Sequence, residues 1–182
     1  MAPEDFGAGV VLITGIQAAG KSTVAQLLAE RLPNSVHLRG DVFRTMIVNG
    51  REDMTPDATD EATRQLRLRH HLTAQSCDQY TAAGFTVIAQ DVVLGEHLTE
   101  LAGTIKSRPL LLVVLAPQPE EIGTREAGRG KVAYDEWSVR ALDEVLHRDT
   151  PRLGLWLDTT GQTPEQTVEE ILRRAPGEAA VS

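Results

Sequence analysis

The sequence of 182 residues contains few aromatic residues, one cysteine and no long apolar stretch. Aromatic residues make up only 4% of the chain, so we expect Leu, Val, Ile and Ala to fill most of the core. Because Cys77 is the only cysteine, no disulfide can form within the chain, which suits a reducing compartment. The longest apolar run, residues 110–116, is too short to span a bilayer.

Positive charge is also scarce. The chain has 18 Lys and Arg against 26 Asp and Glu, a net charge of -8. Long nucleic acids and anionic membranes are therefore disfavoured as partners, because both bind basic surfaces, whereas a small anionic ligand in a local basic pocket is compatible. The first residues, "MAPEDF", are acidic and lack the basic-then-apolar layout of a signal peptide, so we expect a cytoplasmic protein. Nothing in the sequence indicates an oligomeric state.

Short apolar runs alternate with helical stretches along the chain. The runs predict five strands, at residues 10–14, 35–38, 85–90, 110–116 and 153–158. They are Leu-rich or β-branched and mostly do not alternate with polar residues, as expected for strands buried on both faces. Strands in alternation with helices indicate one α/β domain, residues 1–182, built around a parallel sheet.

Two predicted helices carry clear boundary signals. A long helix is expected over about residues 58–83, and Gly84 ends it. The last helix begins at "TPEQ", where Thr163 caps, Pro164 takes the first helical position and Gln166 completes a capping box. Beyond this helix we expect a frayed tail over about residues 175–182.

A phosphate-loop (P-loop) pattern, "GIQAAGKST", joins the first predicted strand to an amphipathic helix. Its glycines let successive backbone N–H groups point at one anion, and the helix adds the positive end of its dipole. Lys21 would reach the β- and γ-phosphates of ATP, and the Ser22 hydroxyl would bind Mg²⁺. The alternative is a tight turn followed by an ordinary surface lysine. The predicted nucleotide-binding residues are Gly15, Gln17, Ala18, Ala19, Gly20, Lys21, Ser22 and Thr23.

Two aspartates follow predicted strands at the edge of the sheet that carries the P-loop. Ligands of parallel α/β sheets collect at this edge. Asp41, after the second strand, could accept the proton of an acceptor hydroxyl, or cap the helix that follows, or do both. Asp91, after the third strand, is predicted to hold Mg²⁺, often through water in such sites, with a strand-end turn as the alternative.

A basic, glycine-rich stretch, residues 124–134, lies between the fourth and fifth predicted strands. It is poor in apolar residues, so we expect a mobile lid over about residues 123–135. Arg125 and Arg129 could close over a transferring phosphoryl group, neutralise its charge and help to exclude water. A solvated basic loop is the alternative.

Together these motifs resemble small P-loop kinases, most closely the chloramphenicol phosphotransferase group. The resemblance rests on "GIQAAGKST", "GDVFRTMI", "VIAQDVVLG", "TREAGRGK" and "LDTT" in this order. It implies a three-layer P-loop NTPase fold with a five-stranded parallel sheet of order 2-3-1-4-5. It also implies ATP- and Mg²⁺-dependent phosphorylation of a small-molecule hydroxyl, with an aspartate after the second strand as the base. The matching positions are Asp41, Lys21, Ser22, Asp91, Arg125 and Arg129.

The acceptor stays open at this point. Residues 50–71, which help to form the acceptor site in such kinases, resemble nothing specific to chloramphenicol binding, and Gln90 stands where the family tends to have a second acid. An antibiotic, a sugar, a nucleoside or a cofactor precursor are all compatible. "HLRGDVFRTMI" also resembles polynucleotide 5′-hydroxyl kinases and toxins that phosphorylate sugar nucleotides, and a non-catalytic nucleotide switch is a further alternative. A helix face with Arg64, Arg67 and His71 could contact an anionic acceptor or only solvent.

Overall fold

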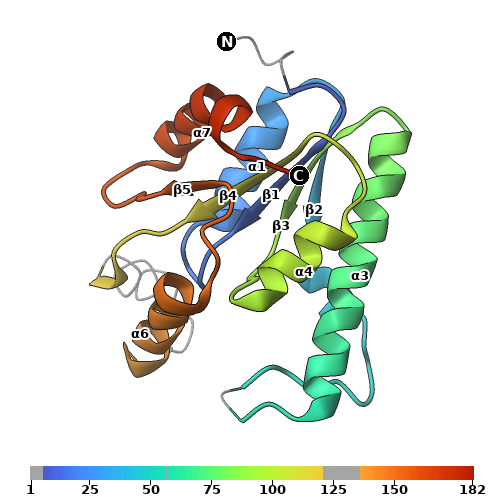
Figure 1. The fold of residues 1–182 in the computed structure, drawn as a ribbon, viewed down its shortest axis with the longest axis vertical. Helices are drawn as coiled ribbons and strands as arrows, with labels where there is room; N and C mark the ends of the chain where they lie inside the picture. The colour runs from blue at the N-terminus through green and yellow to red at the C-terminus, as the bar shows by residue number, and fades with distance from the viewer. Residues whose placement is uncertain (1–5, 56, 121–135) are drawn as a thin grey trace.

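The computed structural model describes residues 6–55, 57–120 and 136–182. Five parallel strands form a sheet in the order β2-β3-β1-β4-β5, which confirms the fold and the strand order implied by the resemblance (Figure 1). In chain order the strands are β1 Val10–Thr14, β2 Ser35–Arg39, β3 Thr86–Gln90, β4 Leu110–Leu115 and β5 Leu155–Leu157. Every residue of β1, β3 and β4 is buried, which explains their unbroken apolar sequences.

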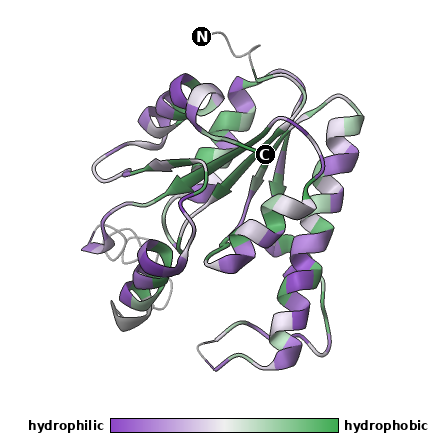
Figure 2. Ribbon diagram, viewed as in Figure 1, coloured by the Kyte–Doolittle hydropathy of each residue, from purple (hydrophilic) through white to green (hydrophobic). Residues whose placement is uncertain are grey.

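Helices cover both faces of this sheet (Figure 1). α1 (Lys21–Arg31) and α7 (Pro164–Glu178) pack on one face, and α3 (Asp60–Ala82) and α4 (Glu96–Thr104) pack on the other. Alternate residues of β1 enter the two cores, because successive side chains of a strand point to opposite faces. Figure 2 shows the result, with hydrophobic strands at the centre and hydrophilic helix surfaces outside.

The remaining helices lie at the carboxyl ends of the strands. α2 (Asp41–Thr45) follows β2 directly, and α6 (Glu136–Glu144) continues into a π-helical turn, η2 (Val145–Asp149). The predicted lid, residues 123–135, with Arg125 and Arg129, lies outside the described residues. None of the described helices is both long enough and apolar enough to cross a membrane.

The helix signals are confirmed, but the expectation of a frayed tail is wrong. Thr163 and Gln166 form the predicted capping box, while residues 175–178 complete α7. The chain then forms a short antiparallel strand, β6 (Ala180–Val181), beside Leu110 and Leu111 of β4. The reason is that β5 pairs only with residues 113–115 of β4, so the first half of this buried strand needs another partner for its backbone.

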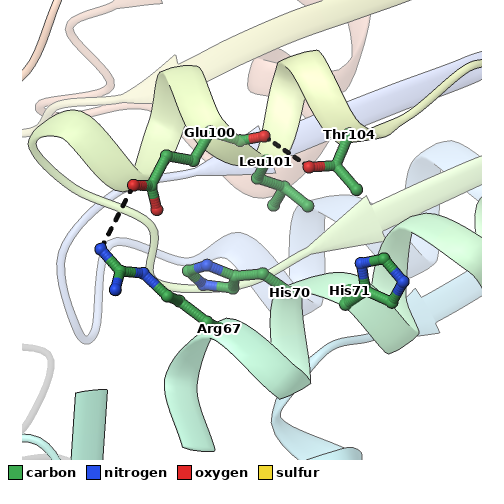
Figure 3. A pocket seen from close by; sticks show the side chains of 6 residues that line it. All are labelled: Arg67, His70, His71, Glu100, Leu101 and Thr104. Atoms are coloured by element: carbon green, nitrogen blue, oxygen red, sulfur yellow. Dashed lines mark hydrogen bonds and ion pairs between the residues drawn. The ribbon is translucent and has the colours of Figure 1, made fainter. Parts of the chain in front are cut away.

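A buried histidine lies between α3 and α4. His70 is 5% exposed, and neither ring nitrogen has a hydrogen-bond partner in the described parts of the chain. Burial is the main cause that lowers its pKa to about 4; Arg69 and His97 act in the same direction and Glu100 opposes them. Figure 3 shows the hollow of about 380 Å³ beside this histidine, lined by Arg67, His70, His71, Glu100, Leu101 and Thr104.

We expect His70 to contribute to acid sensitivity. Between pH 6.5 and 4 the unfolded chain protonates this ring and the folded chain does not, so the free energy of unfolding falls as pH decreases through this window. The full effect is roughly 3 kcal/mol, from the difference between 6.5 and about 4. Urea unfolding at several pH values should show that His70→Phe removes this component, whereas His71→Phe, at the exposed neighbouring position, keeps it. Identical pH profiles for His70→Phe and the parent would contradict the assignment.

Candidate active site

The P-loop forms an anion cradle at the carboxyl end of β1. Ala18 and Gly20 have positive φ angles of 59° and 92°, so the backbone winds inward before α1 begins. Gly15, with φ 151°, passes so close to β4 that a Cβ atom would lie 2.5 Å from the Leu115 carbonyl oxygen. Only glycine fits there. The loop conformation and the helix that follows it suit a bound phosphate.

Lys21 is held inside this cradle. Its side chain is buried, and its Nζ donates a hydrogen bond to the Ile16 carbonyl oxygen at 2.7 Å. Burial lowers its pKa to about 7, although nearby Asp41 acts to raise it. An ordinary surface lysine would be neither buried nor shifted, so the simple-turn alternative does not describe this residue. A polyphosphate would supply the negative charge that this buried amine lacks.

Asp41 lies at the same edge of the sheet and within electrostatic range of Lys21. It is the first residue of α2, whose N-cap is Gly40, and no side chain caps this helix. The capping alternative is therefore wrong. Its Oδ1 atom is shielded from solvent and has no hydrogen-bond partner among the described residues, although the Arg39 Nε lies 3.7 Å away. The Asp41 side chain as a whole is 44% exposed, so the rest of its carboxylate is open to a ligand.

Asp91 is buried at the end of β3 and forms a two-pronged ion pair with Arg69 of α3. The Arg69 Nε lies 2.6 Å from Oδ2, and its Nη2 contacts Oδ1, which also accepts from the Val92 N–H at 2.7 Å. This arginine side chain is only 13% exposed. The pair therefore places a second buried cation beside Lys21, where it acts to lower the pKa of that lysine.

Two features of the neighbouring strand ends, the Thr14 hydroxyl and the Gly40 backbone, hold Asp91 in this position. Thr14 Oγ1, at the end of β1, donates to the Val93 carbonyl at 2.8 Å and accepts from the Val93 N–H at 3.0 Å. Gly40 passes so close to the carboxylate that a Cβ atom would lie 2.3 Å from Asp91 Oδ2. The ends of β1, β2 and β3 are thus joined around one carboxylate.

We expect Gly40→Ala to destabilise the protein by about 1–3 kcal/mol, because the new methyl group must displace the paired carboxylate or the backbone. Gly103→Ala is the matched control. A Cβ atom at this helical position meets nothing within 4 Å, so the substitution should stabilise α4 by roughly 0.5–1 kcal/mol. Chemical denaturation measures both changes, and an unchanged stability of Gly40→Ala would contradict the close approach.

A family model described as an AAA domain matches residues 10–151. The chain belongs to this AAA domain family. A protein of Thermococcus kodakarensis provisionally named adenylate kinase is 29% identical over 169 residues, which cover 90% of this chain and 83% of the relative.

Solved structures agree on the fold. A sugar kinase from a Janibacter species superposes with a TM-score of 0.67 at 19% identity, covering 90% of this chain and 92% of the other. The tunicamycin resistance protein of Deinococcus radiodurans superposes with a TM-score of 0.64 at 18% identity, covering 95% and 99%. At these identities the two superpositions establish the fold alone. The family match and the relative support a kinase-like P-loop NTPase, and the narrower resemblance to chloramphenicol phosphotransferases stays a prediction.

The predicted site residues of this AAA domain that the structure describes lie at one edge of the sheet, with one unforeseen partner, whereas Arg125 and Arg129 lie outside the described residues. The P-loop and Asp41 lie together, whereas the helix face of Arg64, Arg67 and His71 does not join them: Arg64 pairs with Glu61 and Arg67 with Glu100. Arg69 was not anticipated. Asp91 could have indicated such a partner in the sequence, because a carboxylate that follows a fully buried strand requires a cation or several hydrogen-bond donors.

The fit to Mg²⁺ differs between its two predicted ligands. Ser22 is exposed in the first turn of α1, next to the cradle, and its hydroxyl makes no hydrogen bond within the described parts of the chain, so it suits a metal ligand role. Both oxygens of Asp91 are already engaged by Arg69 and by a backbone N–H. Direct ligation by Asp91 would require Arg69 to move, whereas contact through water would not. The donor set therefore fits a cation bound mainly by Ser22 and nucleotide oxygens.

Proposed function

We propose that this P-loop NTPase transfers the γ-phosphate of ATP to a hydroxyl group of a small molecule. The observation that supports the proposal most directly is the position of the Asp41 carboxylate, which lies within electrostatic range of Lys21 beside the P-loop, caps no helix and belongs to a side chain that is 44% exposed. A switch protein needs the nucleotide cradle but does not need an accessible carboxylate beside it. The hydroxyl of an acceptor could donate its proton to the exposed part of this carboxylate.

Each residue then has a distinct task. The P-loop and Lys21 hold the β- and γ-phosphates, and Asp41 orients the acceptor hydroxyl in line with the γ-phosphorus. The acceptor oxygen forms a bond to the γ-phosphorus, the bond from this phosphorus to the β,γ-bridging oxygen breaks, and ADP leaves. The hydroxyl proton passes to Asp41. Mg²⁺ held by Ser22, and by Asp91 through water, would neutralise charge on the phosphate oxygens.

Catalysis of this kind depends on alignment and charge neutralisation more than on covalent chemistry. Lys21 and Arg69 supply the charge within the described residues, and both are largely buried, so water screens them little. Arg125 and Arg129 are proposed to complete the site from the predicted lid.

The experiment is a transfer screen with γ-labelled ATP and Mg²⁺ over hydroxyl-bearing small molecules: sugars, sugar acids, nucleosides and antibiotics. We expect at least one alcohol to become phosphorylated with stoichiometric release of ADP. Lys21→Met should abolish the signal, because the γ-phosphate loses its buried cation. ATP binding without transfer to any alcohol, or only hydrolysis to free phosphate, would contradict the proposal and favour a nucleotide switch.

A further inference from the structure

Two arginines share one carboxylate beside the rim that carries Asp41. Arg44 of α2 donates from Nη1 to Asp53 Oδ1 at 2.6 Å, and the Arg51 Nε lies 3.8 Å from the same oxygen. The Arg44 hydrogen bond is the main cause that lowers the pKa of Asp53, and the charges of Arg51 and Arg69 act in the same direction. One carboxylate thus serves two guanidinium groups, which leaves excess positive charge at this point of an acidic chain.

The arginine pair, Arg44 and Arg51, is close to the proposed base, because Arg44 lies three residues after Asp41 in α2 and shares a helix face with it. Burial lowers the pKa of Arg69 to about 10, nearby Asp41 and Asp53 act to raise it, and Arg44 acts to lower it. Asp53, Arg44 and the proposed base Asp41 therefore all influence the charge of the Arg69 guanidinium. An acceptor whose hydroxyl contacts Asp41 could therefore extend from that residue toward the arginine pair.

The segment that carries Arg51 and Asp53 is fixed in place. Gln65 of α3 donates to the Gly50 carbonyl at 2.8 Å and accepts from the Glu52 N–H at 2.9 Å, so one side chain clamps both ends of the turn. Thr59, the N-cap of α3, also donates to Glu52. The position of the arginine pair is thus built by the fold.

Stability alone is a weak reason for such an arrangement. The Arg44 and Arg51 side chains are 38% and 42% exposed, and exposed ion pairs contribute roughly 0–1 kcal/mol. The same exposure leaves their donors within reach of a ligand. Guanidinium groups bind the planar or tetrahedral oxygens of carboxylates, sulfates and phosphates in a fixed geometry.

We propose that the acceptor carries, in addition to its reacting hydroxyl, an anionic oxygen group that Arg44 and Arg51 bind. The inference rests on the proposed kinase function and names the class of its acceptor: a hydroxy acid, or an alcohol that already bears a phosphate or sulfate. Asp53 keeps the two guanidinium groups aligned, and Asp41 receives the hydroxyl at the other end of the molecule.

The first arm of the test compares acceptors of one skeleton with and without the acid: gluconate with sorbitol, glycerate with glycerol, and nucleoside 5′-monophosphates with nucleosides. We expect kcat/KM at least tenfold higher for the acid member of the accepted pair. Arg44→Met and Arg51→Met should each raise its KM about 10- to 100-fold. Arg31→Met, which removes another exposed arginine paired with Glu169, is the control and should change nothing.

Equal use of the neutral member, or an unchanged KM in both arginine variants, would overturn the inference while the kinase function stands. A nucleoside diphosphate formed from a monophosphate would also overturn it, because the anionic group would then be the acceptor itself.

In the second arm, inorganic phosphate is titrated into protein saturated with Mg²⁺ and non-hydrolysable adenylyl imidodiphosphate. We expect binding that Arg44→Met/Arg51→Met weakens at least tenfold and Arg31→Met leaves unchanged. Phosphate binding without any alcohol phosphorylation would support the anion site and overturn the function, and no difference between variants would overturn the site.

Discussion

Asp41→Asn is expected to slow phosphoryl transfer by about 10²- to 10⁴-fold, the usual contribution of a positioned general base. The amide keeps the size of the carboxylate but cannot take the hydroxyl proton. Since Asp41 makes no described hydrogen bond that the fold requires, the protein should remain folded, and the dissociation constant for ATP should change little. Steady-state transfer to the acceptor from the screen, together with calorimetric ATP titration, measures the two quantities separately.

The control for this variant is Asp60→Asn, which removes the same charge from an exposed acid in the first turn of α3. Its transfer rate should equal that of the parent. A phosphoryl-transfer rate in Asp41→Asn equal to that of the parent would show that Asp41 is not the general base. A loss of ATP binding in Asp41→Asn would show that the carboxylate serves the nucleotide cradle and not the acceptor.

The largest effect on stability is expected for Arg69→Met. This substitution leaves the Asp91 carboxylate buried without its cation, and breaking a buried pair in this way costs about 3–5 kcal/mol. Arg67→Met, two residues earlier on the same helix, is the matched control. The Arg67 side chain is 57% exposed and lies 3.5 Å from Glu100, so its loss should cost no more than about 1 kcal/mol.

The double variant Arg69→Met/Asp91→Asn separates the stability lost through the uncompensated charge from the stability lost through altered packing. Because the uncompensated charge is gone, much of the stability lost in Arg69→Met should return in urea unfolding. If Arg69→Met alone unfolds within 1 kcal/mol of the parent, the ion pair does not hold the rim together. The same free energies of unfolding for the single and double variants would show that the lost side chain matters only for packing.

The fold was largely predictable because its signals are local and repeated. An unbroken apolar run such as residues 110–116 is typical of a strand buried on both faces, and helical stretches separate these runs along the chain. The small strand β6 has no such signal. Its two residues pair only because β5 leaves half of β4 uncovered, which is a property of the assembled sheet and not of the segment itself.

The candidate site was predictable in its parts and not in its pairings. The P-loop pattern locates the cradle because glycine positions and Lys21 obey a fixed spacing. The role of Asp41 was ambiguous in the sequence, since an aspartate before a helix is also a common cap, and only the backbone assigns the N-cap to Gly40. Arg69 was missed because helical spacing drew attention to Arg64 and Arg67, which form surface pairs with other acids.

The central claim, that a hydroxyl acceptor lies between Asp41 and the phosphate cradle, is tested most directly by one structure. The protein would be crystallised with Mg²⁺, ADP, aluminium fluoride and the acceptor found in the screen. We predict an Asp41 carboxylate oxygen within about 2.6–3.2 Å of the acceptor hydroxyl, with that hydroxyl in line with the γ-phosphate mimic. An acceptor hydroxyl in line with the mimic but out of hydrogen-bond reach of Asp41 would contradict the account.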